Sequence, residues 1–340
     1  MASRLARVAQ YAGVSEATVS RVLNGKPGVS TSTRAAVLTA LDVLGYDRPA
    51  HMRSRPNRLI GLVIPEMSNP VFPAFAEVIG SGLAVRGFTP VLCTRTLGGV
   101  AEPDYVDMLL EHQVSGAVFV CGLHSEAAAN HAHYDRLTER GLPVVAVNGM
   151  VEGLKIPCIS ADDALAVRLA LHHLMSLGHE RIGLAIGDTG HVPAARKLAA
   201  FREAMSTQFP RSDPDATAVQ IMYTLEGGTS AAMQLFQNGV TGLVCGSDVQ
   251  ALGAIRAARR LGLDVPGDVS VVGYDDSTFM PLVDPPLTTV RQPIEAMGQA
   301  AVNVLLQQIS GGPPDLREML FEPELVVRAS TGMARPPADG

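Results

Sequence analysis

The sequence predicts a small all-α head joined to a larger α/β core of two doubly wound lobes. Three observations support this: three helical patterns in the first 45 residues, a basic stretch with prolines after them, and two sets of apolar runs alternating with helical segments from residue 59. At 340 residues and 47% hydrophobic content, the chain has enough apolar material for more than one core.

The head, residues 1–45, contains clear helix start and stop signals. Apolar residues repeat at helical spacing in RLARVAQYA, and Gly13 ends this first helix. Ser15 is placed to cap a second helix over 16–23, and a third helix follows Ser30 and ends at Gly45. The second helix is too short to be stable alone, so its neighbours must support it.

The second helix is expected to present a small polar surface. Its valines turn toward the neighbouring helices, which leaves Glu16, Ala17, Ser20 and Arg21 facing out. An arginine can bind guanine N7 and O6, and an alanine methyl can contact a thymine methyl. The pattern therefore indicates a helix-turn-helix unit for a DNA major groove; a three-helix protein-interaction module is the alternative.

Charge is divided unevenly along the chain. Residues 1–58 hold nine basic residues, beginning with Arg4, and three acidic ones, a net charge of +6, whereas the remainder carries −12. A basic head on an acidic body suits a protein that binds a polyanion with its head alone. A solvated charged arm is the alternative.

Residues 46–58, YDRPAHMRSRPNR, are expected to form a basic linker, because Pro49 and Pro56 interrupt regular structure. The core is expected to span 59–333, and 334–340 to be a disordered tail. The predicted strands are LIGLVIP, FTPVLCT, GAVFVCG and PVVAVN, then RIGLAIGD, AVQIMYT, TGLVCGS and VSVVGYDD. Helices are expected near 71–86, 101–112, 126–140, 162–177, 193–206, 227–238 and 249–261.

Several protein classes are disfavoured. No run of eighteen apolar residues and no apolar leader is present, so we expect a cytoplasmic protein without a membrane span. The four cysteines have no C-x-x-C spacing and are expected to be reduced core thiols. His131, His133, His172 and His173 lack the partners of a zinc site and are expected on helix surfaces. We find no nucleophile elbow and no phosphate-binding loop, so neither an enzyme nor a cofactor is indicated.

The run VAQYAGVSEATVSRVLNGKPGVSTSTRAAVLTALDVLGY resembles the DNA-binding head of LacI/GalR-family transcriptional regulators. The resemblance implies that Glu16, Ala17 and Arg21 read bases. It also implies that Ser20, Asn24 and Thr33 lie near phosphates.

The linker departs from the family pattern. Where members carry a leucine after an Arg-Ser pair, as a minor-groove wedge in a hinge helix, this chain has Arg53-Ser54 followed by Arg55 and Pro56. Met52 is then a candidate apolar substitute, or Arg53 and Arg55 enter a narrow minor groove by charge. A disordered tether is the alternative.

The resemblance extends over SNPVF, SLGHERIG, the run from SDVQALG to GYDDS, PPLTTVRQP and ELVVRAST. It implies a type I periplasmic-binding-protein-like core whose chain crosses between lobes near 160, 287 and 318. The expected first lobe comprises 59–160 and 287–318, and the second 161–286 and 319–333.

A ligand is expected beyond the carboxyl ends of the strands, in a cleft between the lobes. Polar and aromatic residues at strand ends or helix starts are Asn69, Phe72, Asn148, Asp248, Asp275 and Gln292. The resemblance adds Ser247 and Tyr223, and it places Lys197, with Arg196 adjacent, where the family commonly has a ligand-binding arginine. Asp248 and Asp276 have helix capping as an alternative role. The pair Asp162-Asp163 is expected first as a helix cap.

These observations together predict a ligand-controlled repressor that binds double-stranded, palindromic operator DNA as a homodimer. A sugar is the expected effector, and the resemblance to actinobacterial maltose-operon repressors suggests a malto-oligosaccharide; a purine or a phosphosugar is the alternative. The other functional class is a sugar-binding or sugar-converting protein whose N-terminal helices serve in assembly. The C-terminal stretch has no leucine heptads, so a tetramer is not expected.

Overall fold

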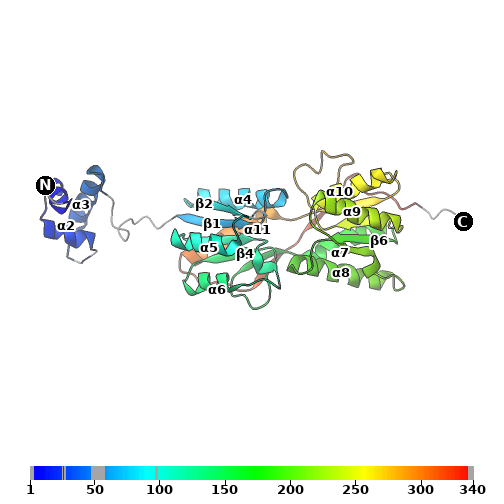
Figure 1. The fold of residues 1–340 in the computed structure, drawn as a ribbon, viewed down its shortest axis with the longest axis horizontal. Helices are drawn as coiled ribbons and strands as arrows, with labels where there is room; N and C mark the ends of the chain where they lie inside the picture. Colours follow the sequence, from blue (N-terminus) through cyan, green and yellow to red (C-terminus); the bar gives the residue numbers. More distant parts are fainter. Residues whose placement is uncertain (1–3, 25, 27, 47–57, 96–98, 336–340) are drawn as a thin grey trace. The chain divides into compact units, whose positions relative to one another are not determined.

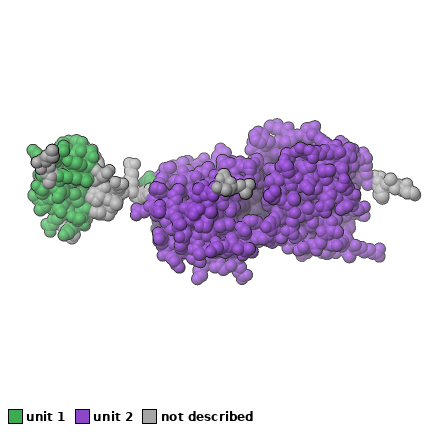
Figure 2. All heavy atoms as spheres, in the orientation of Figure 1, with its two compact units in different colours: residues 1–58 green, residues 59–340 purple. Residues whose placement is uncertain are grey.

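The computed structural model describes residues 4–24, 26, 28–46, 58–95 and 99–335. It divides into two compact units, residues 1–58 and residues 59–340 (Figure 2).

The first unit contains the three predicted helices, α1 (Arg4–Ala12), α2 (Glu16–Leu23) and α3 (Thr31–Val43). Ser15 begins α2, because its side chain accepts the Thr18 amide N–H at 3.1 Å. One buried cluster joins the helices; its members are Val8, Ala9, Val19, Val22, Val37, Ala40 and Leu41. The apolar face of α2 is therefore supported by α1 and α3, as its short length requires.

The first lobe of the second unit is a parallel sheet with helices on both faces (Figure 1). In spatial order its strands are β2 (Thr89–Thr94), β1 (Leu59–Ile64), β3 (Gly116–Val120), β4 (Val144–Val147), β5 (Cys158–Ala161) and β11 (Glu318–Phe321). Helices α4 (Val71–Val85) and α11 (Ile294–Ile309) pack on one face, and α5 (Glu102–Glu111) and α6 (Ala132–Glu139) on the other. The central strands are apolar throughout because both of their faces are covered.

The second lobe repeats this arrangement. Its strands are, in spatial order, β7 (Ala218–Gln220), β6 (Ile182–Ile186), β8 (Gly242–Cys245), β9 (Ser270–Asp275), β10 (Thr288–Arg291) and β12 (Glu324–Val326). Only β12 among them is antiparallel to its neighbour. Helices α7 (Asp163–Ser176) and α8 (Val192–Gln208) cover one face, and α9 (Leu225–Gln237) and α10 (Asp248–Arg260) the other. The predicted pair of doubly wound lobes is confirmed.

The chain crosses between the sheets at 162, at 292–293 and at 322–323. The expected crossings near 287 and 318 are therefore too early. Strand β10 follows residue 287 but pairs with β9 in the second sheet, and β11 begins at residue 318 but pairs with β5 in the first.

Two smaller expectations also need correction. Helix α6 begins at Ala132 rather than near 126, because Asn130 Oδ1 accepts the Ala132 amide N–H at 2.9 Å after a separate 3-10 turn, η2 (Leu123–Ser125). The expected tail at 334–340 is ordered at its start: the Ala334 amide donates to the Leu177 carbonyl at 2.8 Å, and Arg335 pairs with Asp268. Residues 336–340 lie outside the described part of the chain.

The four cysteines are free thiols, as expected. Burial raises the pKa of the Cys93 thiol to about 11 and the pKa values of Cys121 and Cys158 to about 12. The expectation that His133 lies on a helix surface is wrong. The residue is buried, and its Nε2 contacts Glu102 Oε1 at 2.9 Å. Within the described residues, no helix has the length and apolar character needed to cross a membrane.

Candidate functional site

Helix α2 has one buried and one outward face. Glu16, Ala17 and Arg21 are exposed, while Ser20 is half-buried one turn from Ala17. Asn24 ends the helix, and its side-chain amide donates to the Ser20 carbonyl at 2.8 Å. The outward face therefore combines short side chains with one guanidinium, which allows the close approach that reading base edges requires.

The remaining expected DNA-contacting residues lie outside α2: Arg4 is on α1, Thr33 is on α3, and the others are in the linker. The exposed Arg4 guanidinium lies 4.9 Å from the centroid of the Tyr46 ring, and Arg7 lies 5.7 Å from the same centroid. Thr33, at the start of α3, accepts a hydrogen bond from Ser30 Oγ at 2.8 Å. The expected linker contacts, Met52, Arg53 and Arg55, lie outside the described residues.

A cavity of about 1460 Å³ lies between the two lobes of the second unit. Residues that follow β1 and β3 line it from the first lobe, and residues that follow β6 and β8 line it from the second. In each sheet these two strands flank the point where strand order reverses, which is where doubly wound folds bind ligands.

Eight of the ten expected effector residues line this cavity: Asn69, Phe72, Asn148, Lys197, Tyr223, Ser247, Asp275 and Gln292. Asn69, Asn148, Asp275 and Gln292 are each less than a tenth exposed. A buried polar group needs a hydrogen-bonding partner, so these side chains favour a polar ligand.

Three residues that end strands and line the cavity have left-handed backbones. Their φ values are +46° at Cys121, +68° at Asn148 and +115° at Asp275. Non-glycine residues rarely adopt such conformations, because the side chain crowds the backbone, and three of them at one cavity wall are unusual.

Lys197 is a buried cation held from two sides. Its ammonium group forms an ion pair with Asp163, and it lies 4.2 Å from the centroid of the Tyr274 ring. Burial raises the pKa of the Asp163 carboxyl, and the charge of Lys197 opposes that rise. Asp163 therefore neutralises much of the positive charge that Lys197 offers to a ligand.

Asp275 and Gln292 form a second polar pair at the wall. Gln292 Nε2 donates to Asp275 Oδ1 at 2.6 Å, while Gln292 Oε1 is buried without a hydrogen-bond partner among the described residues. Burial raises the pKa of Asp275 well above its ordinary value, and the charge of Asp248 adds to the rise. The free amide oxygen is an acceptor placed for a donor from a bound molecule.

Tyr223 stands in the second-lobe wall because two glycines make room for it. A Cβ atom added at Gly187 would lie 2.2 Å from the Tyr223 ring, and one added at Gly246 would lie 2.9 Å from it. Larger residues at either position would displace the ring from the cavity.

Arg196 and Asp248, the other two expected effector residues, do not line the cavity. Arg196 forms a bidentate ion pair with Glu318, at 2.8 and 2.7 Å, and so joins α8 of the second lobe to β11 of the first. Asp248 turns inward and accepts hydrogen bonds from the Ser277 amide at 2.7 Å and from Thr289 Oγ1 at 2.6 Å. It does not cap α10, because Ser247 Oγ accepts the Gln250 amide there at 3.2 Å.

Sequence reasoning missed several lining residues. Of the expected capping pair, Asp162 does cap α7, but Asp163 faces the cavity. Glu102 also lines it and accepts hydrogen bonds from His133 at 2.9 Å, from Tyr134, and from the Leu123 amide at 3.1 Å. Burial opposes ionisation of Glu102, but these hydrogen bonds outweigh it and lower its pKa. Asp163 and Glu102 are positioned by partners more than thirty residues away in the chain, Lys197 for the first and His133 and Tyr134 for the second. Local sequence pattern therefore gives no signal for either residue.

Comparison with known proteins places the two units in one family. The model for bacterial regulatory proteins of the lacI family matches residues 4–48, and the model for a periplasmic binding protein-like domain matches residues 171–331. The transcriptional regulator MalR of Streptomyces coelicolor is 52% identical over 337 residues, 98% of this chain and 98% of MalR. The chain belongs to the LacI family.

Two solved LacI-like structures are similar across nearly the whole chain. The lac repressor dimer bound to operator and the anti-inducer ONPF is 30% identical, with a TM-score of 0.74, and the match covers 98% of this chain and 100% of that one. The transcriptional regulator CelR in complex with cellobiose is 31% identical, with a TM-score of 0.71, over 97% of this chain and 100% of that one.

Proposed function

We propose that this LacI-family regulator represses sugar-utilisation genes and that a sugar bound in the cavity between the lobes raises or lowers its affinity for operator DNA. The observation that supports this most directly is a polar, aromatic-lined cavity in the same chain as a helix whose outer face suits a major groove. The family membership makes a sugar-binding or sugar-converting protein the weaker candidate.

For DNA binding, we propose that Glu16, Ala17 and Arg21 read base edges and that Ser20, Asn24 and Thr33 contact phosphates. One α2 helix reaches too few base pairs for useful specificity, so a homodimer on a palindromic operator is required. The similar lac repressor is a dimer on its operator, which agrees with this assignment. Residues 46–58 would then carry the head as a linker, with Arg4 adding to the basic surface.

For the effector, we propose a neutral sugar longer than a monosaccharide. The cavity of about 1460 Å³ exceeds the roughly 300–1,000 Å³ of common small-molecule pockets. Carboxylates and amides suit hydroxyl groups, and Phe72 and Tyr223 offer faces to C–H surfaces. Acidic lining residues outnumber basic ones, which disfavours a phosphosugar. A malto-oligosaccharide fits this chemistry, and the related CelR binds cellobiose.

We propose a regulatory rather than a catalytic role. A protein that binds operator DNA works where the chromosome is, in the cytoplasm. No role in this proposal needs a cofactor or a metal.

A thermal-shift screen of the full chain tests the proposal, with maltose, maltotriose, cellobiose, nucleobases and phosphosugars as probes. A sugar that raises the melting temperature should then change operator affinity in a binding assay. The test variant is Gln292→Leu, which removes the unpartnered Gln292 Oε1 acceptor and should reduce the rise in melting temperature that the sugar causes. A shift from a nucleobase or a phosphosugar and from no sugar would overturn the effector assignment; failure to bind any selected palindromic DNA would overturn the function.

A further inference from the structure

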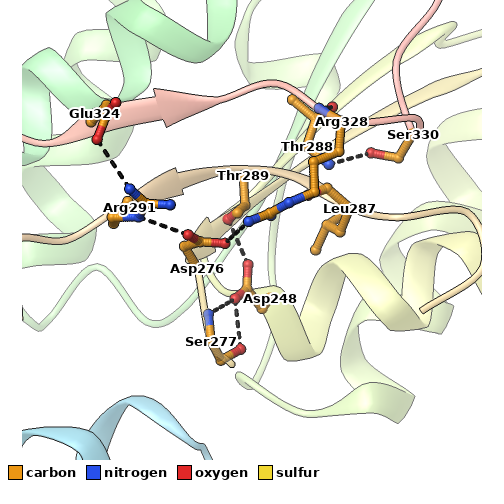
Figure 3. A network of polar contacts seen from close by, with 10 residues as sticks. All are labelled: Asp248, Asp276, Ser277, Leu287, Thr288, Thr289, Arg291, Glu324, Arg328 and Ser330. Carbon is orange, nitrogen blue, oxygen red and sulfur yellow. Dashed lines mark hydrogen bonds and ion pairs between the residues drawn. The ribbon is translucent and has the colours of Figure 1, made fainter. Parts of the chain in front are cut away.

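Asp276 follows the cavity-lining Asp275 but does not itself line the cavity. Its side chain is 6% exposed and lies between two arginines (Figure 3). Arg291 Nε donates to Asp276 Oδ2 at 2.7 Å, and Arg328 Nη2 contacts Asp276 Oδ1 at 2.6 Å. Arg291 thus holds one carboxylate oxygen by a hydrogen bond, and Arg328 holds the other by an ion pair alone, since Oδ1 is buried without a hydrogen-bond partner among the described residues.

Arg291, a partner of Asp276, and Glu324, a partner of Arg291, mark the ends of two crossing segments. Arg291 is the last residue of β10, directly before the crossing at 292–293, and Glu324 is the first residue of β12, directly after the crossing at 322–323. The two are cross-strand neighbours, and Arg291 Nη1 donates to Glu324 Oε2 at 3.2 Å. Asp276 thus contacts the end of β10 directly, at Arg291, and is linked to the start of β12 only through the contact between Arg291 and Glu324.

Arg328, the second arginine bound to Asp276, also contacts the start of β10. Its Nη1 donates to the Leu287 carbonyl at 2.7 Å, and its backbone amide donates to Thr288 Oγ1 at 2.9 Å. On the other side of Asp276, the Ser277 amide and hydroxyl both donate to Asp248 at 2.7 Å, and Thr289 donates to the same carboxylate. Figure 3 shows these contacts joining the first residue of α10, residues directly after β9, residues of β10 and Arg328, which follows β12.

The backbone at this point needs such support. Asp275 and Asp276 have φ values of +115° and +56°, two left-handed residues in succession. Such a conformation persists only where surrounding contacts hold it. Asp275 is also held by Gln292, the first residue of a crossing segment. The cavity wall and the second-lobe end of the 292–293 crossing segment therefore meet at the same short stretch of chain.

We propose that Asp276 is a positioning residue that locks the second-lobe ends of two hinge segments to the effector-facing end of β9. Movement between the lobes then pivots at 292–293 and 322–323 and carries Asp275 with the second lobe. Without the charge of Asp276, Arg291 and Arg328 lose their common partner, and the range of lobe arrangements widens. The proposal concerns the hinge itself and does not require the effector or the operator to be known.

The test is Asp276→Asn in the full chain without ligand. Asparagine tolerates a left-handed backbone, so the variant removes charge without adding backbone strain. Spin labels are attached to Glu139→Cys in the first lobe and Ser206→Cys in the second, both at exposed positions. Double electron–electron resonance then measures the distance between the two labels. The four native thiols are buried or half-buried and burial raises their pKa values, so we expect them to react with the label more slowly than the introduced cysteines.

The distance distribution should be roughly twofold broader in Asp276→Asn than in the parent, as expected for a hinge with more accessible states. The matched control is Asp284→Asn in the same lobe, which removes an exposed 3.2 Å ion pair with Arg259 and should leave the distribution unchanged. If Asp276→Asn fails to fold, Arg291→Gln decides, with the same broadening expected. A distribution unchanged in the folded variant, or broadened equally in the control, overturns the proposal.

Discussion

Removing Lys197 should destabilise the core by leaving Asp163 buried without its partner. The two side chains are each 5% exposed, and their contact is direct. Breaking one side of a buried ion pair costs about 3–5 kcal/mol, whereas replacing both sides with apolar residues is often neutral. We therefore expect Lys197→Met to lose about 3–5 kcal/mol of unfolding free energy at pH 7, and Asp163→Leu/Lys197→Met to recover most of that loss.

The pH dependence of the same variant follows from Asp163. Burial raises the pKa of Asp163, and Lys197→Met removes the charge that opposes this rise. A carboxyl whose pKa is higher in the folded than in the unfolded state stabilises the protein at low pH, and this contribution is lost as pH rises through the folded-state pKa. The deficit of Lys197→Met should therefore shrink between pH 7 and pH 5.

Urea unfolding followed by near-ultraviolet circular dichroism measures these differences, since the adjacent Tyr274 contributes to the signal. The control is Asp315→Asn, which removes an ion pair with Arg317 at the surface and should leave the midpoint unchanged. A Lys197→Met variant as stable as the parent, or a double variant as unstable as the single one, would refute the reasoning.

Two further predictions concern DNA reading and titration. Arg21→Ala should cost about 1–3 kcal/mol of specific binding, while Asn24→Ala should weaken operator and scrambled DNA alike; an unchanged specificity ratio in Arg21→Ala by fluorescence anisotropy contradicts the base-reading role. Burial raises the pKa of Asp248 from 3.8 to about 6. The stability advantage of the parent over Asp248→Asn should thus fall by about 2 kcal/mol from pH 4 to pH 7, and a constant difference in urea unfolding would exclude that titration.

The sequence predicted the head and the central strands because both rest on local periodicity. The outward face of α2 follows from the spacing of its valines, and β1, β3, β4, β8 and β9 are apolar runs with two buried faces. Strands β10, β11 and β12 were not predicted as elements. They are three or four residues long, mix polar with apolar side chains, and are defined by partners distant in the chain.

Much of the cleft was predicted because strand ends in doubly wound folds meet at one edge. The errors arise between adjacent residues, either on a helix, where neighbours point about 100° apart, or at the junction of an N-cap with its helix. Lys197 turns into the cavity while Arg196 turns to Glu318, and Ser247 lines the cavity while Asp248 turns to Thr289. Local pattern does not decide which member of such a pair faces a ligand, because the decision depends on charges supplied by other segments.

Operator affinity measured with and without sugar shows whether occupation of the core cavity controls DNA binding. Palindromic DNA is selected from a random pool by the full chain, and its dissociation constant is measured by fluorescence anisotropy at rising concentrations of a sugar that shifts the melting temperature. We expect the sugar to change operator affinity about 5- to 150-fold in either direction, and to have a smaller effect in Gln292→Leu. An operator affinity that stays constant while the sugar saturates the protein would contradict this expectation.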